Sequence, residues 1–177
     1  MPYERSPVPT VKKTVTLIEP FDGGCPGPEH FKIVDAEVPA CKEDGDILLQ
    51  VLAMSADPYL RGRIRSMKAG QPMAGFISGV VIESKDEEWK VGDLFGTNAE
   101  FTNILVMSAA ARKQGLIWKL TGLCEEENIS YGVGVLGMPG STAYGGLIDV
   151  LKPKENDVLF VSAAAGAVGV KRQAPNG

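Results

Sequence analysis

The stretch that most constrains the fold is Asp157 to Gly169, DVLFVSAAAGAVG, in a chain of 177 residues. Val158 to Val161 form a short apolar, partly β-branched run, which is typical of a strand buried on both faces of a parallel sheet. Small residues follow at once. A strand that leads into a glycine-bearing turn is how a dinucleotide-binding fold begins, because it presents backbone N–H groups and a helix N-terminus to a pyrophosphate.

The turn can be compared with the fingerprint G-x-G-x-x-G. Ala164 stands at the first glycine, whereas Gly166 and Gly169 hold the second and third. Gly166 would let the backbone approach phosphates, and Gly169 would let the next helix lie close to the strand. By itself the motif fits a small-residue loop after any core strand equally well. The candidate cofactor-binding residues of this turn are Ala164, Ala165, Gly166, Ala167, Val168 and Gly169.

A second motif, MPGSTAY at Met138 to Tyr144, lies at the right distance upstream to open a helix that leads into this strand. We expect the helix over residues 140–151, before Pro153, and the strand over residues 157–162. Ser141 or Thr142 could cap the helix.

The first two thirds of the chain show a different pattern, of short apolar segments separated by turn residues. Short segments rich in Val, Ile, Leu, Phe and Thr alternate with Gly, Pro and Asp, which predicts a small β-barrel or sandwich over residues 10–125. The expected strands are 14–20, 31–39, 46–54, 75–83, 89–96, 101–106 and 116–120. Glu125 to Asn128 read as a helix start or a loop, and the composition shifts to Gly, Leu, Val and Ala at Tyr131. We therefore expect two domains, residues 1–130 and 131–177.

A third motif, SADPYLRGR at Ser55 to Arg63, follows the third expected strand. Pro58 excludes the helical conformation at Asp57, so the chain turns there. The Tyr59 hydroxyl could bond a ligand while its ring lines a pocket. The alternative is a tyrosine packed at a barrel corner, next to two solvated arginines.

Composition and charge exclude several classes of function. A net charge of −4 and a pI near 5.1 give no electrostatic footprint for nucleic acid or an anionic membrane. No apolar run approaches the ~20 residues of a membrane span, and the N-terminus lacks the apolar core of a secretory signal. Cytoplasm is the expected compartment.

The ligands of a zinc site are also missing. Cys25, Cys41 and Cys124 are scattered without C-x-x-C spacing, and His30 is the single histidine. Three reduced cysteines and no metal site are expected.

Together the three motifs resemble the zinc-independent branch of the medium-chain dehydrogenase/reductase superfamily, which holds prostaglandin reductases and alkenal or enone double-bond reductases. The resemblance extends to about Val170. It implies a mainly β fold with an α/β start: a GroES-like β-barrel that carries the substrate side of the cleft, followed by the first elements of an incomplete Rossmann domain.

The resemblance also implies a reaction, in which NADP(H) reduces the carbon–carbon double bond of an enal or enone. Tyr59 would face nicotinamide and substrate as the candidate catalytic residue, and Met138 and Thr142 would join the glycine turn in cofactor binding. A small-molecule substrate and a homodimer are expected. A quinone-type reductase of the same superfamily is an alternative. A non-catalytic fragment that acts by protein interaction is another.

Eight residues follow Gly169, and they include Pro175 and Gly177. A βαβ unit takes ~30 residues, so neither a full crossover helix nor a second strand fits there. The ribose-reading residue of a dinucleotide fold would lie beyond the end. We therefore expect a truncated nucleotide domain, and a 177-residue chain that does not itself turn over an enone.

Overall fold

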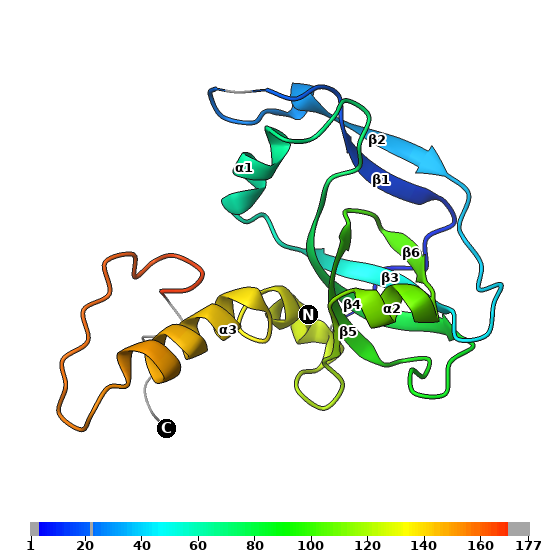
Figure 1. Ribbon diagram of the computed structural model, residues 1–177. Helices are drawn as coiled ribbons and strands as arrows, with labels where there is room; N and C mark the ends of the chain where they lie inside the picture. Colours follow the sequence, from blue (N-terminus) through cyan, green and yellow to red (C-terminus); the bar gives the residue numbers. More distant parts are fainter. Residues whose placement is uncertain (1–3, 22, 170–177) are drawn as a thin grey trace.

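The computed structural model describes residues 4–21 and 23–169, and its barrel part consists of two antiparallel sheets (Figure 1). The larger sheet has five strands in the order β6-β3-β4-β5-β7, and β1 pairs with β2 in a separate hairpin. The strands are β1 (Lys12–Leu17), β2 (Phe31–Ala36), β3 (Ile47–Met54), β4 (Ala74–Ser84), β5 (Leu94–Glu100), β6 (Ile104–Met107) and β7 (Ile117–Lys119). The mainly β prediction is confirmed.

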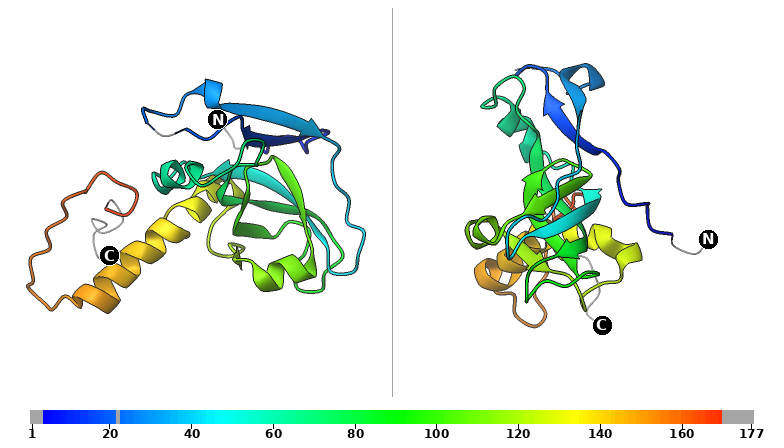
Figure 2. Two further views of the ribbon diagram at one scale, coloured as in Figure 1. Left: turned by 45° about the horizontal axis from the view of Figure 1, so that its top comes forward. Right: turned by 90° about the vertical axis from the view of Figure 1, so that its right-hand side faces the viewer.

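Strand β1 joins the two sheets. The Val15 N–H donates to the Phe101 carbonyl at 2.9 Å, and the Met73 N–H donates to the Val15 carbonyl at 2.8 Å. An isolated bridge also pairs Thr14 with Thr102. The hairpin is therefore held across one end of the large sheet, as the left view of Figure 2 shows. This closure buries Leu17, Ile64 and Met73 between the hairpin and the strands below it.

The large sheet carries apolar side chains on both faces, because its strands alternate between two separate cores. On the inner face, Ile77 and Val81 of β4 pack with Ile47 and Leu49 of β3 and with Phe95 of β5. On the outer face a second cluster forms around Val80, Leu94, Leu120 and Ile129. The second cluster places the segment after β7 on the outside of the barrel.

That segment contains η2 (Glu126–Val133), a 3₁₀-helix that packs on the outer face of β3, β4 and β5. The Ser78 hydroxyl of β4 donates to the Ile129 carbonyl at 2.8 Å. A Cβ at Gly132 would lie 2.8 Å from the Cβ of Ser78 in β4, so the backbone approaches the sheet at a distance that only glycine allows. The chain between β7 and the next helix is thus anchored to the barrel.

The remaining helices are short. They are η1 (Pro28–His30), α1 (Tyr59–Ile64), α2 (Ala109–Gln114), α3 (Met138–Tyr144) and the π-helix η3 (Gly145–Leu151). α3 and η3 run on from each other and project away from the barrel (Figure 1). The expected helix over 140–151 is confirmed, and it ends where Lys152 adopts a left-handed conformation (φ 50°) before Pro153. We did not predict α1 and α2, because each has only six residues.

The expected strand over 157–162 is wrong. Residues 157–161 belong to no strand of the described chain, and the side chains of Val158 and Phe160 are 96% and 87% exposed. A strand needs a neighbouring backbone to hydrogen-bond with, and within residues 4–21 and 23–169 no segment pairs with this one. Figures 1 and 2 show residues 152–169 looping outside the barrel, beyond η3.

Several strand boundaries differ from expectation: β1 runs from Lys12 to Leu17 instead of 14–20, β2 ends at Ala36 instead of 39, and two other strands begin later than expected. The strand expected at 89–96 begins only at Leu94, since Val91 to Asp93 form a turn in which Gly92 has a φ of +93°. The strand expected at 101–106 begins at Ile104, because Phe101 and Thr102 serve the bridge to β1. Each of the seven strands expected over residues 10–125 has a counterpart in the structure.

Candidate functional site

Three aromatic side chains form a row on the outer face of the large sheet, between α1 and η2. Tyr59 of α1 contacts Phe76 of β4 edge to face, with ring centroids 6.4 Å apart and planes at 74°. Phe76 in turn lies 6.3 Å from Trp118 of β7. We call Tyr59, Phe76 and Trp118 the aromatic shelf.

The register of strand pairing brings the side chains of the aromatic shelf together. Phe76 pairs with Asn98 across β4 and β5, and Gly96 pairs with Trp118 across β5 and β7. A Cβ at Gly96 would lie 2.4 Å from the indole Cε2, so the missing side chain is what lets Trp118 lie against β5. The sequence pattern predicted these strands but did not show which side chains would meet across them.

Tyr59 is the polar end of the shelf. Its side chain is 38% exposed, and it begins α1 directly after the turn at Pro58. Burial raises the pKa of the phenol, the nearby Asp57 carboxylate raises it further, and a hydrogen bond with Asn98 and the charge of Arg63 offset part of the effect. The hydroxyl therefore stays protonated at neutral pH and can donate a hydrogen bond.

The turn beside Tyr59 is held rigidly. The Ser55 hydroxyl donates to the Asp57 carboxylate at 2.5 Å. Arg63 donates to the Ala74 carbonyl at 3.1 Å, whereas Arg61 donates to the Gly24 carbonyl at 3.1 Å and lies over the Phe21 ring. The two arginines are therefore not merely solvated, as one interpretation of the sequence had it, but fasten α1 to the barrel and to the hairpin loop.

At its other end the shelf is bonded to the start of α3. The indole N–H of Trp118 donates to the Leu136 carbonyl at 3.1 Å, two residues before α3 begins at Met138. This hydrogen bond joins the residues just before the sequence motif MPGSTAY to the sheet on which the Tyr59 ring packs. Of the predicted site residues, Tyr59 belongs to the shelf, and Met138 lies two residues after Leu136, to which the shelf is hydrogen-bonded.

The prediction that Ser141 or Thr142 caps this helix is wrong. The helix begins earlier than expected, with Gly137 as its N-cap and without a side-chain cap. Thr142 lies one turn inside the helix, and its hydroxyl donates back to the Met138 carbonyl at 2.8 Å. The Thr142 oxygen keeps its lone pairs, so it can still accept a hydrogen bond.

The glycine turn Ala164 to Gly169 has a compact backbone. The Gly166 N–H donates to the Ala163 carbonyl at 3.0 Å. A Cβ at Gly169 would lie 2.0 Å from that same carbonyl oxygen, so this position requires glycine. The segment before the turn is not a strand, and residues 170–177, which include the expected tail with Pro175, lie outside the described residues. In residues 157–169 the strand–turn geometry that binds a pyrophosphate is therefore not formed.

An apolar hollow adjoins the shelf. It has a volume of about 420 Å³ and lies between the β1–β2 hairpin and α1, with Leu60, Ile64, Met73 and Phe101 among its walls. The Phe101 ring and the Tyr59 hydroxyl both approach Gly75, where a Cβ would lie 2.8 Å from Phe101 Cζ and 3.3 Å from the hydroxyl oxygen. A ligand bound at Tyr59 would thus be separated from this apolar hollow by the Phe101 ring.

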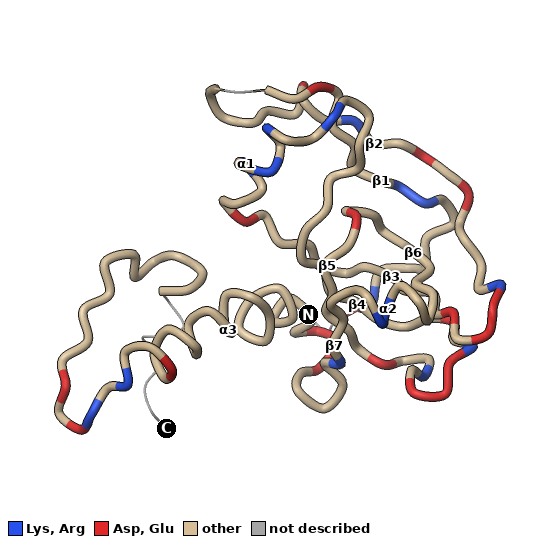
Figure 3. Tube along the Cα trace, viewed as in Figure 1, with Lys and Arg blue, Asp and Glu red and all other residues tan. Residues whose placement is uncertain are grey.

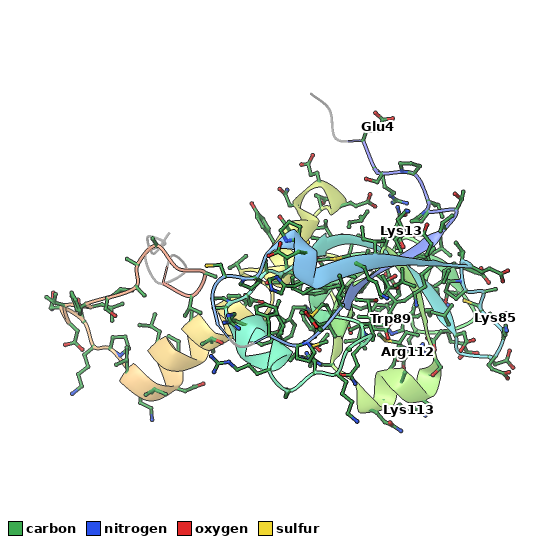
Figure 4. The ribbon with its side chains drawn as sticks, turned by 90° about the horizontal axis from the view of Figure 1, so that it is seen from above. Glu4, Lys13, Lys85, Trp89, Arg112 and Lys113 are labelled. Atoms are coloured by element: carbon green, nitrogen blue, oxygen red, sulfur yellow. The ribbon has the colours of Figure 1, made fainter. Side chains whose placement is uncertain are left out.

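A larger hollow, of about 1030 Å³, lies on the side of the barrel with α2. Figure 4 labels Lys85, Trp89, Arg112 and Lys113 there. Its charges neutralise each other, because Arg112 pairs with Asp86, and Lys119 with Asp93 at 2.7 Å. Figure 3 shows the same alternation of acidic and basic residues around that end of the barrel. We therefore interpret this hollow as a part of the barrel surface that ion pairs stabilise, and not as a ligand site.

The described residues contain neither a metal-ligand cluster nor a helix that could span a membrane. Within residues 4–21 and 23–169, no three His, Cys, Asp or Glu residues gather where they could hold a metal ion. Cys25 is exposed, Cys41 is buried and Cys124 is half-buried, each as a free thiol. Among the same residues, no helix combines the length and the apolar character needed to cross a membrane.

Comparisons with known proteins place the barrel in a family. Residues 13–114 match the family described as the N-terminal domain of oxidoreductase. Prostaglandin reductase 1 from Oryctolagus cuniculus is 35% identical over 157 residues, which cover 89% of this chain and 43% of the relative. The NADPH-dependent curcumin reductase of Escherichia coli is 34% identical, covering 82% of this chain and 42% of the relative. The NADP(+)-dependent 2-alkenal reductase of Nicotiana tabacum is 29% identical, and the match covers 90% of this chain and 48% of the relative.

Solved structures of similar proteins support the same family assignment. CurA from Vibrio vulnificus matches with a TM-score of 0.73 and 31% identity over 91% of this chain and 47% of CurA. CurA in complex with NADPH matches with a TM-score of 0.68. The chain thus spans about half the length of the relatives it matches. The expected GroES-like barrel is confirmed, and the chain belongs to the oxidoreductase N-terminal-domain family, in the zinc-independent prostaglandin and alkenal reductase branch of the medium-chain dehydrogenase/reductase superfamily.

Proposed function

We propose that this chain forms the substrate-side half of an NADP(H)-dependent reductase of the carbon–carbon double bond in α,β-unsaturated aldehydes and ketones. The observation that carries the proposal is the place of Tyr59 at the end of an aromatic shelf, to which the residues just before α3 are hydrogen-bonded. The relatives support it, because the similar proteins include an alkenal reductase and a curcumin reductase. Residues 1–130 would be the substrate-side domain and residues 131–177 the start of the nucleotide domain.

The proposed role of Tyr59 follows from where charge develops. When bound, the nicotinamide cofactor supplies hydride to the β-carbon of the substrate. Negative charge then gathers on the carbonyl oxygen, and a fixed hydrogen-bond donor there stabilises the transition state. Tyr59 is such a donor, since a phenol carries its proton at neutral pH and the raised pKa does not change that. Phe76 and Trp118 would stack against the flat conjugated system and exclude water from it.

The cofactor fits one part of the site better than the other. Met138 and Thr142 lie on α3, where they would hold the nicotinamide end, and the Thr142 hydroxyl oxygen could accept a hydrogen bond from a carboxamide N–H. The proposed pyrophosphate contacts, Ala164, Ala165, Gly166, Ala167, Val168 and Gly169, lack a strand in front of their turn. The described residues do not form a pyrophosphate cradle, and we derive no step from one.

A second candidate function rests on the exposed apolar residues after α3. Val158, Phe160 and Val150 are 96%, 87% and 77% exposed. Such a surface favours contact with another protein, so a non-catalytic interaction role is the alternative from a different class. Titration with NADPH separates the two roles: micromolar binding supports the reductase, and a folded barrel without binding supports the interaction role.

The reductase proposal is tested by NADPH oxidation with trans-2-hexenal. Two proteins are compared: the 177-residue chain, and a chimera in which its residues 1–169 precede the nucleotide-domain portion of the rabbit prostaglandin reductase 1. We expect turnover by the chimera only, because the described residues contain no parallel sheet to hold a dinucleotide. A folded chimera without turnover would contradict the proposed function. Turnover by the 177-residue chain would instead contradict the need for that sheet.

The role of Tyr59 has its own test in the chimera. Tyr59→Phe should lower kcat about 100-fold, which is the effect of removing one hydrogen-bond donor to a developing oxyanion. Tyr144→Phe is the matched control, because Tyr144 is 66% exposed and lies on α3 away from the shelf; its kcat should not change. Equal kcat values for Tyr59→Phe and the parent would remove Tyr59 from the mechanism.

A further inference from the structure

The proposed chemistry uses the ring of Trp118 but does not explain its indole N–H. Its ring belongs to the aromatic shelf and lies near Phe76, whereas its N–H donates a hydrogen bond to the Leu136 carbonyl at 3.1 Å. Leu136 lies between η2, which is fixed to the sheet, and α3, which projects away from it. The indole thus joins a barrel strand to the residues just before α3.

Both partners of the Trp118–Leu136 hydrogen bond are held in place by their surroundings. On the sheet side, Gly96 leaves room for the indole, because a Cβ there would lie 2.4 Å from Cε2. On the helix side, Leu136 is held by its own N–H, which donates to the Tyr131 carbonyl at 2.8 Å. Close packing continues at Gly137 and Gly140, where a Cβ would lie 2.4 Å from the Gly132 carbonyl and 1.8 Å from the Val135 carbonyl. A shift of Leu136 would therefore move the start of α3 with it.

We infer that Trp118 is a positioning residue: its hydrogen bond to Leu136 fixes the start of α3, with Met138 and Thr142, relative to Tyr59, whose ring packs against Phe76 of the same sheet. The chain of contacts runs from the Tyr59 ring through Phe76 and the indole to the Leu136 carbonyl. In the proposed reductase this sets the separation between the group that holds the substrate carbonyl and the helix that holds the nicotinamide end. The functional half of this inference rests on the proposed function, whereas the structural half does not.

Hydrogen exchange tests the structural half in the 177-residue chain. Trp118→Phe keeps a ring on the shelf but loses the N–H, so amides 136–144 should exchange about tenfold faster, with β3 and β4 unchanged. Trp89→Phe is the matched control, since it removes an indole from the inner core. Exchange of residues 136–144 that is unchanged in Trp118→Phe, or raised equally in the control, would overturn the inference.

A measurement on the unsubstituted chain covers the case in which Trp118→Phe does not fold. In a spectrum of the ¹⁵N-labelled indoles, the Trp118 N–H should exchange with solvent at least tenfold more slowly than that of free tryptophan, because it is hydrogen-bonded. An indole N–H that exchanges at the free rate would overturn the inference without any variant.

Kinetics of the chimera test the functional half. Misplacing one reacting partner lowers the rate of the chemical step more than it weakens binding. Trp118→Phe should therefore lower kcat about tenfold and leave KM for trans-2-hexenal within about twofold. An unchanged kcat, or equal changes in the Trp89→Phe control, would overturn the positioning role. If no form of the chimera turns over, the proposed function fails, and the exchange experiments still decide whether Trp118 fixes α3.

Discussion

The barrel and the segment after α3 are made of similar residues but have opposite environments. Phe95 in β5 is completely buried, whereas Phe160, in an equally apolar run, is 87% exposed. The difference lies in partners: β5 pairs with β4 and β7, and residues 157–161 pair with no strand in the described chain. Apolar and β-branched residues therefore make a strand only where another backbone receives their hydrogen bonds.

The largest effect expected from this comparison is on stability. Phe95→Ala should lower the free energy of unfolding by about 3–5 kcal/mol, because it leaves a cavity in the inner core. Phe160→Ala, the same change outside the barrel, should stay within about 0.5 kcal/mol. Urea unfolding of both variants measures this. Equal losses would show that residues 157–161 are packed.

A smaller effect is expected from two glycines. Gly96→Ala would place a Cβ 2.4 Å from the Trp118 indole and should cost about 1–3 kcal/mol, because the ring must move off β5. Gly166→Ala meets only the Ala163 carbonyl, at 3.3 Å, and should stay within about 0.5 kcal/mol. Thermal unfolding compares them, and Trp118 fluorescence should change in the first variant alone. A costly Gly166→Ala would indicate a tightly packed turn outside the barrel.

How far the sequence predicts this molecule depends on whether a feature is local. β3 and β4 were predicted because ILLQVLAM and AGFISGVVIES are apolar and bounded by turns. The aromatic shelf was not predicted, because it depends on the pairing of Phe76 with Asn98 and of Gly96 with Trp118, which are distant in sequence. Alternation along the predicted strands could have placed Phe76 and Trp118 on one face only if the register had been known. Tyr59 was found through its motif, and its neighbours were not.

The smallest effect is on the response to acid. Burial of the Asp86 carboxylate opposes ionisation, but N–H groups of Glu88 and Trp89 and the Arg112 charge outweigh it and hold its pKa below the ordinary value. A carboxyl whose pKa is lower in the folded state stabilises the fold above its unfolded pKa, and this contribution is lost as pH falls through the folded pKa. The barrel should therefore lose stability below about pH 4.

Asp86→Asn should remove part of that pH dependence and cost about 1 kcal/mol or less at pH 7. Asp149→Asn on η3 is the control outside the barrel, because its side chain is exposed and it should leave both quantities unchanged. Urea unfolding at pH 7 and pH 3 measures them. If Asp86→Asn retained the full pH dependence of the parent, the Asp86 turn would not contribute to the stability of the barrel.

The contrast between barrel and segment is tested most directly by hydrogen exchange across the 177-residue chain under native conditions. Amides of β3, β4 and β5 should be strongly protected, because they lie in paired strands around the inner core. Amides of residues 158–161 should exchange at nearly the rate of an unfolded chain, because no strand pairs with them. Protection of residues 158–161 equal to that of β4 would contradict the account, since it would mean that this segment lies in a sheet.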